Sequence, residues 1–153
     1  MNQTRPANST TPAGRPNGLP VLVIDDNDTE REIIIRYLGQ AWPFEREMIL
    51  DSAVDGREAL KKIRSNRYAL IVLDWKMPHV DGSEVLRTIR HSGVRIPVVV
   101  LSGFSRAEIT EDLDSLGAAF VNKDEMGSIS FHQAIATSLR LLGFMPVPPA
   151  GSP

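Results

Sequence analysis

The feature that most constrains the fold is an alternation of short, continuous apolar runs with amphipathic segments. Four runs have the length of a strand and contain no polar residue, as expected for strands buried on both faces of a sheet. They are Val21–Ile24, Leu70–Leu73, Val98–Leu101 and Ala118–Val121. The segment Phe44–Leu50 alternates more, so we expect it to form a weaker strand at an edge.

Between the runs, apolar residues recur at helical spacing. This spacing predicts helices through Ile33–Leu38, Ala59–Ile63, Val85–Ile89 and Ile109–Leu116, and a last helix over Ser128–Leu142. Strand–helix alternation implies a parallel sheet with helices on both faces and right-handed crossovers. The sequence therefore predicts an α/β fold of the (βα)5 type.

The two ends of the chain lack this periodicity. Both are rich in proline and small polar residues, so we expect a disordered leader at residues 1–18 and a disordered, proline-rich tail at 145–153. Residues 19–144 have a size common for one domain.

Composition excludes several classes of function. The net charge is −2 and the basic residues are scattered, so we expect no direct contact with nucleic acid. The absence of cysteine excludes disulfides and thiol chemistry. Because no apolar run approaches the length of a membrane span and no signal peptide is evident, we expect a cytoplasmic protein without membrane insertion.

Polar side chains stand where the predicted strands end. Asp25 and Asp26 follow the first strand, Asp74 follows the central strand, Ser102 ends the fourth, and Lys123 comes shortly after the fifth. Parallel strands all end at one edge of the sheet, where ligands bind. We therefore expect three carboxylates, a hydroxyl and an ammonium in one crevice.

This set of groups suits phosphoryl chemistry. Carboxylates ~4 Å apart repel by ~4 kcal/mol per pair at an effective dielectric of ~20, so they need a cation, and an all-oxygen set suits Mg²⁺. Lys123 and Ser102 could hold phosphoryl oxygens, and Asp74 could be the nucleophile that forms an aspartyl-phosphate. Asp28 and Glu30 continue the acidic spacing, but the glycine and distal glutamate of a calcium loop are missing.

At this point the motifs resemble those of receiver domains of bacterial two-component response regulators, especially stand-alone receivers like the chemotaxis one. VLVIDDNDTER matches the acidic pair, DWKMPHVDG the phosphoacceptor loop, VVVLSGF the switch hydroxyl and FVNK the invariant lysine. The resemblance covers residues 19–144. It implies a flavodoxin-like, doubly wound sheet of five parallel strands in the order 2-1-3-4-5.

The resemblance also implies roles for single residues. Asp74 would be the phosphoacceptor, and Lys123 and Ser102 would bind the phosphoryl group. Phe120 would act with Ser102 as the aromatic switch, although a plain core role for Phe120 is nearly as well supported by its place at the end of a buried strand.

A magnesium site follows from the same resemblance. Asp26 would bind Mg²⁺ directly and Asp25 would act through a metal-bound water. Asp74 and the backbone carbonyl of Lys76 would complete the protein ligands.

Two departures from the family pattern carry expectations of their own. Asp124 stands where family members usually have a proline, often after a cis bond, so we expect a trans bond there. Lys76 and Phe104 are bulky and lie two residues after Asp74 and Ser102, so we expect them to form a rim that hinders attacking water.

The resulting prediction is a single-domain response regulator that is not an enzyme. It would accept a phosphoryl group on Asp74 from a histidine kinase or phosphotransfer protein, and signal by docking onto another protein. Two alternatives stay open on the residues alone: a hydrolase of the haloacid dehalogenase type with Asp25 or Asp26 as nucleophile, and a receiver-shaped interaction protein that is never phosphorylated.

Overall fold

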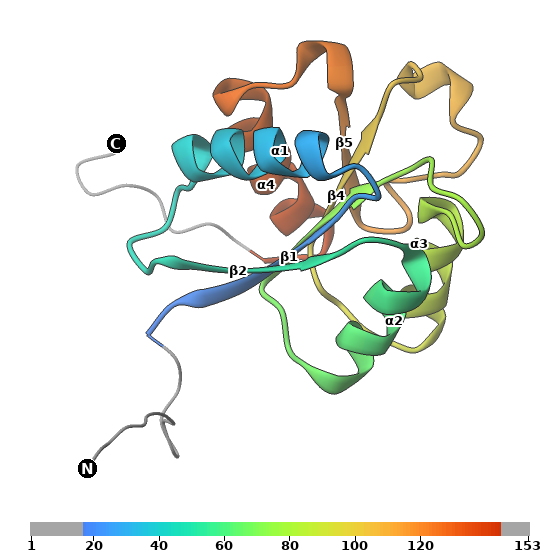
Figure 1. Cartoon of the computed structure of the whole chain (residues 1–153), viewed down its shortest axis with the longest axis horizontal. Helices are drawn as coiled ribbons and strands as arrows, with labels where there is room; N and C mark the ends of the chain where they lie inside the picture. Colours follow the sequence, from blue (N-terminus) through green and yellow to red (C-terminus); the bar gives the residue numbers. More distant parts are fainter. Residues whose placement is uncertain (1–16, 145–153) are drawn as a thin grey trace.

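The computed structural model describes residues 17–144 and contains one parallel sheet (Figure 1). Its strand order is β2-β1-β3-β4-β5, so the predicted doubly wound topology is confirmed. The strands are β1 (Leu19–Ile24), β2 (Met48–Ala53), β3 (Leu70–Asp74), β4 (Val98–Ser102) and β5 (Ala118–Asn122). Residues 1–16 of the leader expected at 1–18, and the tail expected at 145–153, lie outside the described residues.

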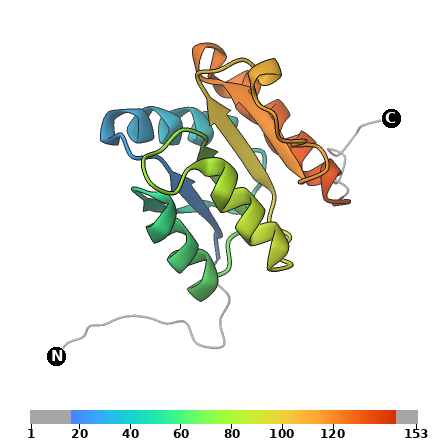
Figure 2. The same ribbon diagram turned by 90° about the vertical axis from the view of Figure 1, so that its right-hand side faces the viewer.

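The helices cover both faces of the sheet. They are α1 (Asp28–Ala41), α2 (Gly56–Ser65), α3 (Gly82–His91) and α4 (Ser128–Leu141). Helices α1 and α4 lie on one face, and α2 and α3 lie side by side on the other (Figures 1 and 2). No helix in the part of the chain that the structure describes is long and apolar enough to cross a membrane.

The first three helices begin in the same way, after the loop that follows the carboxyl end of the preceding strand. The side chains of Asn27, Asp55 and Asp81 each accept a hydrogen bond from the backbone N–H three residues later. Such a cap satisfies one of the free N–H groups at a helix start. The caps therefore fix where the chain turns back at the edge of the sheet that carries the polar residues.

The core lies in two layers, one on each face of the sheet. Every residue of β3 and β4 is buried, and neighbouring residues contribute to opposite layers. Val72 and Val99 pack with α1 and α4, whereas Leu73 and Val100 pack with α2 and α3. These continuous apolar runs are what placed both strands correctly from the sequence.

The edge strand β2 begins later than expected. Residues 44–47 form a loop, and the strand starts at Met48 rather than at Phe44. The Phe44 ring packs edge-on against Trp42 at 5.0 Å, and the Trp42 indole N–H donates to the carbonyl of Arg46 at 2.7 Å. These local contacts hold the segment as a loop, although its place at an edge of the sheet is as predicted.

The prediction of a helix through Ile109–Leu116 is wrong. Within the described residues, the connection from β4 to β5 contains a short 3₁₀ turn at Arg106–Glu108 and further turns up to residue 117. Ile109 and Leu113 are buried on the α2/α3 face, so the apolar spacing served burial and not a helix. The segment has few strong helix formers, and Asp112 accepts hydrogen bonds from the Ser115 N–H and hydroxyl in a local turn.

Candidate functional site

The carboxyl ends of β1, β3 and β5 bring together three of the residues singled out from the sequence. The Lys123 ammonium lies 3.0 Å from Asp74 Oδ1 and 3.6 Å from Asp25 Oδ2. Both carboxylates are buried, whereas the lysine side chain is 19% exposed. Strand geometry thus assembles an ion-pair network from residues far apart in the sequence.

Burial dominates the electrostatics of the two carboxylates. It raises the pKa of Asp74 to about 7, with a further increase from the charge of Asp25, against the lowering effect of Lys123. Burial also raises the pKa of Asp25, although Oδ1 accepts a 2.8 Å hydrogen bond from the Asn27 N–H. Asp25 Oδ2 is buried without a hydrogen-bond partner among the described residues. A single lysine therefore leaves this buried negative charge incompletely compensated.

A fourth charged group, Glu30, completes the network. Its Oε1 lies 2.6 Å from the Lys123 ammonium, which is shorter than either distance to the buried aspartates. Carboxylate oxygens of Asp25, Glu30 and Asp74 lie within 4.8 Å of one another. Sequence reasoning assigned Glu30 no role. Its position in the first turn of α1, whose cap Asn27 follows β1, was the signal that could have placed it at this edge.

Asp26 lies at the border of this cluster. Its side chain is exposed, and it is not among the three carboxylates that converge most closely. Its charge nevertheless contributes to the raised pKa of Asp74, after burial and Asp25. The charge of Asp26 thus acts on Asp74 from outside the group of three carboxylates.

The cluster fits a hard divalent cation. Its donors are all carboxylate oxygens, and Asp25 Oδ2 is buried with no hydrogen bond and only the 3.6 Å contact with the Lys123 ammonium to balance its charge. Mg²⁺ is bound through one or two carboxylates and retains several waters, which suits a site at the solvent-facing edge of a sheet.

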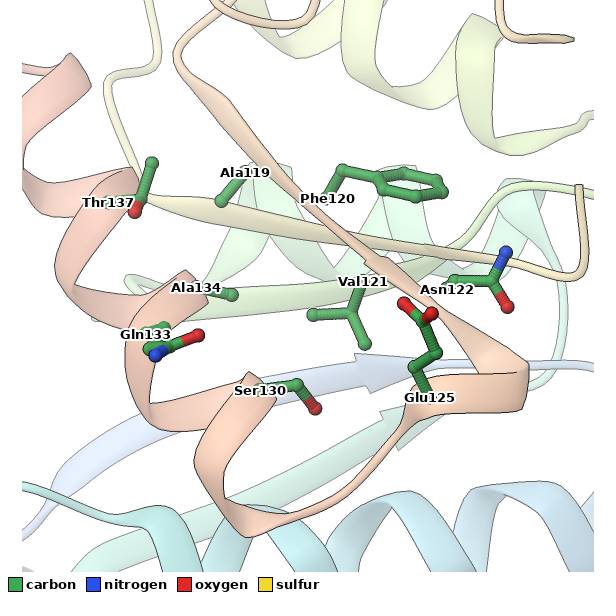
Figure 3. Close-up of a pocket in the computed structure, with 9 residues that line it drawn as sticks. All are labelled: Ala119, Phe120, Val121, Asn122, Glu125, Ser130, Gln133, Ala134 and Thr137. Carbon is green, nitrogen blue, oxygen red and sulfur yellow. The ribbon is translucent and has the colours of Figure 1, made fainter. Parts of the chain in front are cut away.

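The expected switch residues lie on β4 and β5. Ser102 is buried, and its hydroxyl oxygen accepts a 3.0 Å hydrogen bond from the Phe104 N–H. Phe120 is half-buried and packs toward the α2/α3 layer, on the opposite side of the β5 ribbon from Val121 (Figure 3). Phe120 is also among the residues that line a pocket between β5 and α4.

The two rim residues contact each other. Lys76 and Phe104 are both exposed, and the Lys76 ammonium lies over the Phe104 ring, 5.5 Å from its centroid. This distance is within the range of a cation–π interaction. This contact joins the loops that follow β3 and β4.

Asp124 does not prevent Lys123 from entering the site. All peptide bonds in the described residues are trans, as expected for the bond that precedes Asp124. Residues Lys123–Glu125 form a 3₁₀ turn, in which the Asn122 side chain accepts a 2.7 Å hydrogen bond from the Asp124 N–H. This turn positions the lysine without the proline typical of the family.

A family model described as the response regulator receiver domain matches residues 21–135. The chain belongs to the response regulator receiver family. Membership excludes the haloacid dehalogenase alternative.

Curated relatives carry this domain within longer proteins. The chain is 35% identical over 101 residues to a protein-glutamate methylesterase/protein-glutamine glutaminase of a Nocardioides species, covering 66% of this chain and 27% of that protein. It is 32% identical over 137 residues to the gliding motility regulatory protein of Myxococcus xanthus, covering 86% of this chain and 17% of that protein. The chain thus spans less than a third of the length of either relative.

Solved receiver structures are also similar. The response regulator TrrA of Thermotoga maritima, solved in complex with Mg²⁺-BeF, is 33% identical with a TM-score of 0.57, covering 69% of this chain and 86% of that one. The chemotaxis protein CheY4 of Vibrio cholerae is 26% identical with a TM-score of 0.64, covering 80% and 99%.

Proposed function

We propose that this chain is a phosphoacceptor module that takes a phosphoryl group onto Asp74 from a histidine kinase or a histidine phosphotransfer protein. The observation that carries the proposal is the buried Asp74 carboxylate at the end of the central strand, 3.0 Å from the Lys123 ammonium. Membership of the receiver family supports the same assignment.

In the transfer step, an Asp74 oxygen attacks the phosphorus of the donor. A bond forms from that oxygen to phosphorus, and the bond from phosphorus to the donor nitrogen breaks, with the electron pair leaving on the nitrogen. Lys123 then neutralises phosphoryl oxygens in place of the carboxylate oxygen it now contacts. Catalysis of such transfers is mostly positioning and charge neutralisation, for which these groups are suited.

Mg²⁺ is the proposed cofactor. Asp25, Asp26 and Asp74, together with the backbone carbonyl of Lys76, are the protein groups that we propose to hold it. When bound, the ion neutralises charge that develops on the transferred phosphoryl group. The buried Asp25 oxygen that has no hydrogen-bond partner among the described residues supports this assignment.

Output is proposed to occur by docking onto another protein. Ser102 would turn toward the phosphoryl group and lose the hydrogen bond that its hydroxyl now accepts from the Phe104 N–H. Phe120 would then move inward. The surface that responds would consist of β5, α4 and the turns between β4 and β5, because the helix expected there is absent from the described chain. That the receiver domain is a stand-alone, single-domain protein stays a prediction. The mass of the native protein, measured in the cells that produce it, would test this prediction.

Incubation with a small phosphodonor and Mg²⁺, followed by mapping of the acyl phosphate, tests the assignment. We expect labelling on Asp74 that requires Mg²⁺ and is lost in Asp74→Asn. The matched control is Asp114→Asn, which removes an exposed aspartate outside the site and should leave labelling unchanged. Undiminished labelling of the Asp74→Asn protein would refute the proposal.

The proposed output has its own measurement. Amide spectra recorded with Mg²⁺ and beryllofluoride should shift at Ser102, at Phe120 and along α4. Shifts restricted to the residues around Asp74 would contradict a docking surface that responds to phosphorylation.

A further inference from the structure

The Lys123 ammonium contacts three carboxylates and cannot keep all three contacts while it also binds the oxygens of a phosphoryl group. Glu30, Asp74 and Asp25 surround it at 2.6, 3.0 and 3.6 Å. The closest of the three is Glu30, on the first turn of α1, and not the proposed phosphoacceptor. Glu30 thus occupies a position on the lysine that an incoming phosphoryl group would need.

The Glu30 contact differs from the other two in its surroundings. The side chain of Glu30 is 44% exposed, whereas those of Asp25 and Asp74 are nearly inaccessible. An exposed carboxylate loses little hydration when it pairs and regains water when it is released. Breaking the contact between Glu30 and Lys123 therefore costs little free energy, whereas breaking the contact of a buried aspartate with Lys123 costs more.

We infer that Glu30 is a positioning residue that holds Lys123 in the unphosphorylated site and must release it when the phosphoryl group binds. The inference rests on the proposed phosphoacceptor function of Asp74. Because the lysine cannot bind Glu30 and the phosphoryl oxygens with full strength at once, Glu30 lowers the affinity of the site for a phosphoryl group. Glu30 thereby limits how much of the protein is phosphorylated at a given donor supply.

Glu30 is not inferred to be a metal ligand, and this distinction is testable. A ligand would strengthen Mg²⁺ binding directly, whereas a partner of Lys123 acts mainly on the phosphoryl group. The two roles predict different results for the same substitution, Glu30→Gln, which keeps the shape of the side chain and removes its charge.

The matched control is Asp28→Asn. Asp28 lies in the same first turn of α1 and carries the same charge, but it pairs with Arg31 at 2.5 Å rather than with Lys123. A general effect of negative charge in this turn would appear in both variants. Melting curves of the two variants establish that both remain folded.

The experiment measures beryllofluoride binding at saturating Mg²⁺ through the fluorescence of Trp75, the buried neighbour of Asp74. We expect Glu30→Gln to bind beryllofluoride about threefold or more tightly than the wild type, the order expected for loss of a partly solvated ion pair. Asp28→Asn should match the wild type. Mg²⁺ titration without beryllofluoride should change by less than about threefold in Glu30→Gln.

A second measurement uses the metal-free protein. The ¹⁵N signal of the Lys123 ammonium should shift in Glu30→Gln and stay in place in Asp28→Asn, because only the former loses the 2.6 Å contact.

Three results would overturn the inference. They are unchanged or weaker beryllofluoride binding in Glu30→Gln, an equal gain in Asp28→Asn, and a loss of Mg²⁺ affinity of about threefold or more in Glu30→Gln. Failure of the wild type itself to bind beryllofluoride with Mg²⁺ would instead refute the proposed function, so the two failures are distinguishable.

Discussion

Arg90 on α3 holds together the segments that lead into β4 and β5. Its guanidinium donates to the carbonyls of Leu116 at 2.6 Å, Val94 at 2.8 Å, Ile96 at 2.8 Å and Gly117 at 3.2 Å. Since the β4–β5 connection lacks an α-helix, its carbonyls depend on such a donor. We expect Arg90→Met, which keeps most of the side-chain volume, to destabilise the fold strongly.

The magnitude follows from the bonds that are lost. Each net hydrogen bond contributes about 1 kcal/mol, and bonds from a charged donor contribute about 1.5–3 kcal/mol. Arg90 is only half-buried, so water can reach some of the freed carbonyls and the lower value applies. The three bonds of 2.8 Å or less then give a loss of about 3 kcal/mol in the free energy of unfolding.

Urea unfolding followed by circular dichroism measures this loss against a control on the same helix. Arg87→Met removes an exposed ion pair with Glu111 at 2.8 Å and should cost at most about 1 kcal/mol. If the two variants lose the same stability, the carbonyls around Arg90 do not need it and the reasoning is refuted.

Two further predictions concern the backbone near the site and the dependence of stability on pH. A Cβ at Gly82 would lie 2.6 Å from the carbonyl oxygen of Asp74, so Gly82→Ala should lower the free energy of unfolding, measured in urea, by about 2 kcal/mol. Gly39 in α1 has open space around it, so the control Gly39→Ala should raise the free energy of unfolding by about 0.5–1 kcal/mol. Burial raises the pKa of Asp51, but the hydrogen bonds that it accepts, including one from Tyr68 at 2.6 Å, outweigh burial and hold that pKa below its ordinary value. The stabilisation from a lowered pKa is complete above the pKa of the group in the unfolded state and is lost as the pH falls. The difference in unfolding free energy between wild type and Asp51→Asn should therefore shrink below about pH 4, and a constant difference down to about pH 2 would contradict this.

The sequence predicted those parts of the fold whose pattern has one structural meaning. An uninterrupted apolar run such as Val98–Leu101 is typical of a strand that is covered on both faces of a parallel sheet, and β4 lies between β3 and β5 with every residue buried. The spacing of Ile109 and Leu113 has two meanings, because a series of turns can bury both side chains as well as a helix can. Periodicity alone could not choose between them.

The site was partly predictable for a related reason. Asp25, Asp74 and Lys123 lie at strand ends, so the topology brings them together once the strands are known. Glu30 lies on a helix, and its contact with Lys123 joins residues 93 positions apart through the direction of two long side chains. No local pattern specifies such a contact, since it depends on where the first turn of α1 faces.

The contact between Lys76 and Phe104 bears on how long a phosphoryl group would stay on Asp74. Hydrolysis requires a water in line with the bond between phosphorus and the Asp74 oxygen, and near-attack geometry is worth several kcal/mol. Lys76 follows Asp74 by two residues, and its ammonium lies over the ring of Phe104, 5.5 Å from the centroid. The Asn122 side-chain amide also donates to the Phe104 carbonyl at 3.2 Å, which ties this loop to β5.

We therefore predict slow loss of the phosphoryl group relative to receivers with small residues at these two positions. Because the cation–π contact holds the lysine stem and the ring against each other, removing either partner frees the other, so Lys76→Asn and Phe104→Ala should each accelerate dephosphorylation severalfold. For the same reason, the fold-increase in the dephosphorylation rate of the double variant should be smaller than the product of the fold-increases in the two single variants. Dephosphorylation followed after removal of the phosphodonor decides the matter: an unchanged or slower rate in both single variants means that water reaches phosphorus by a path these side chains do not obstruct.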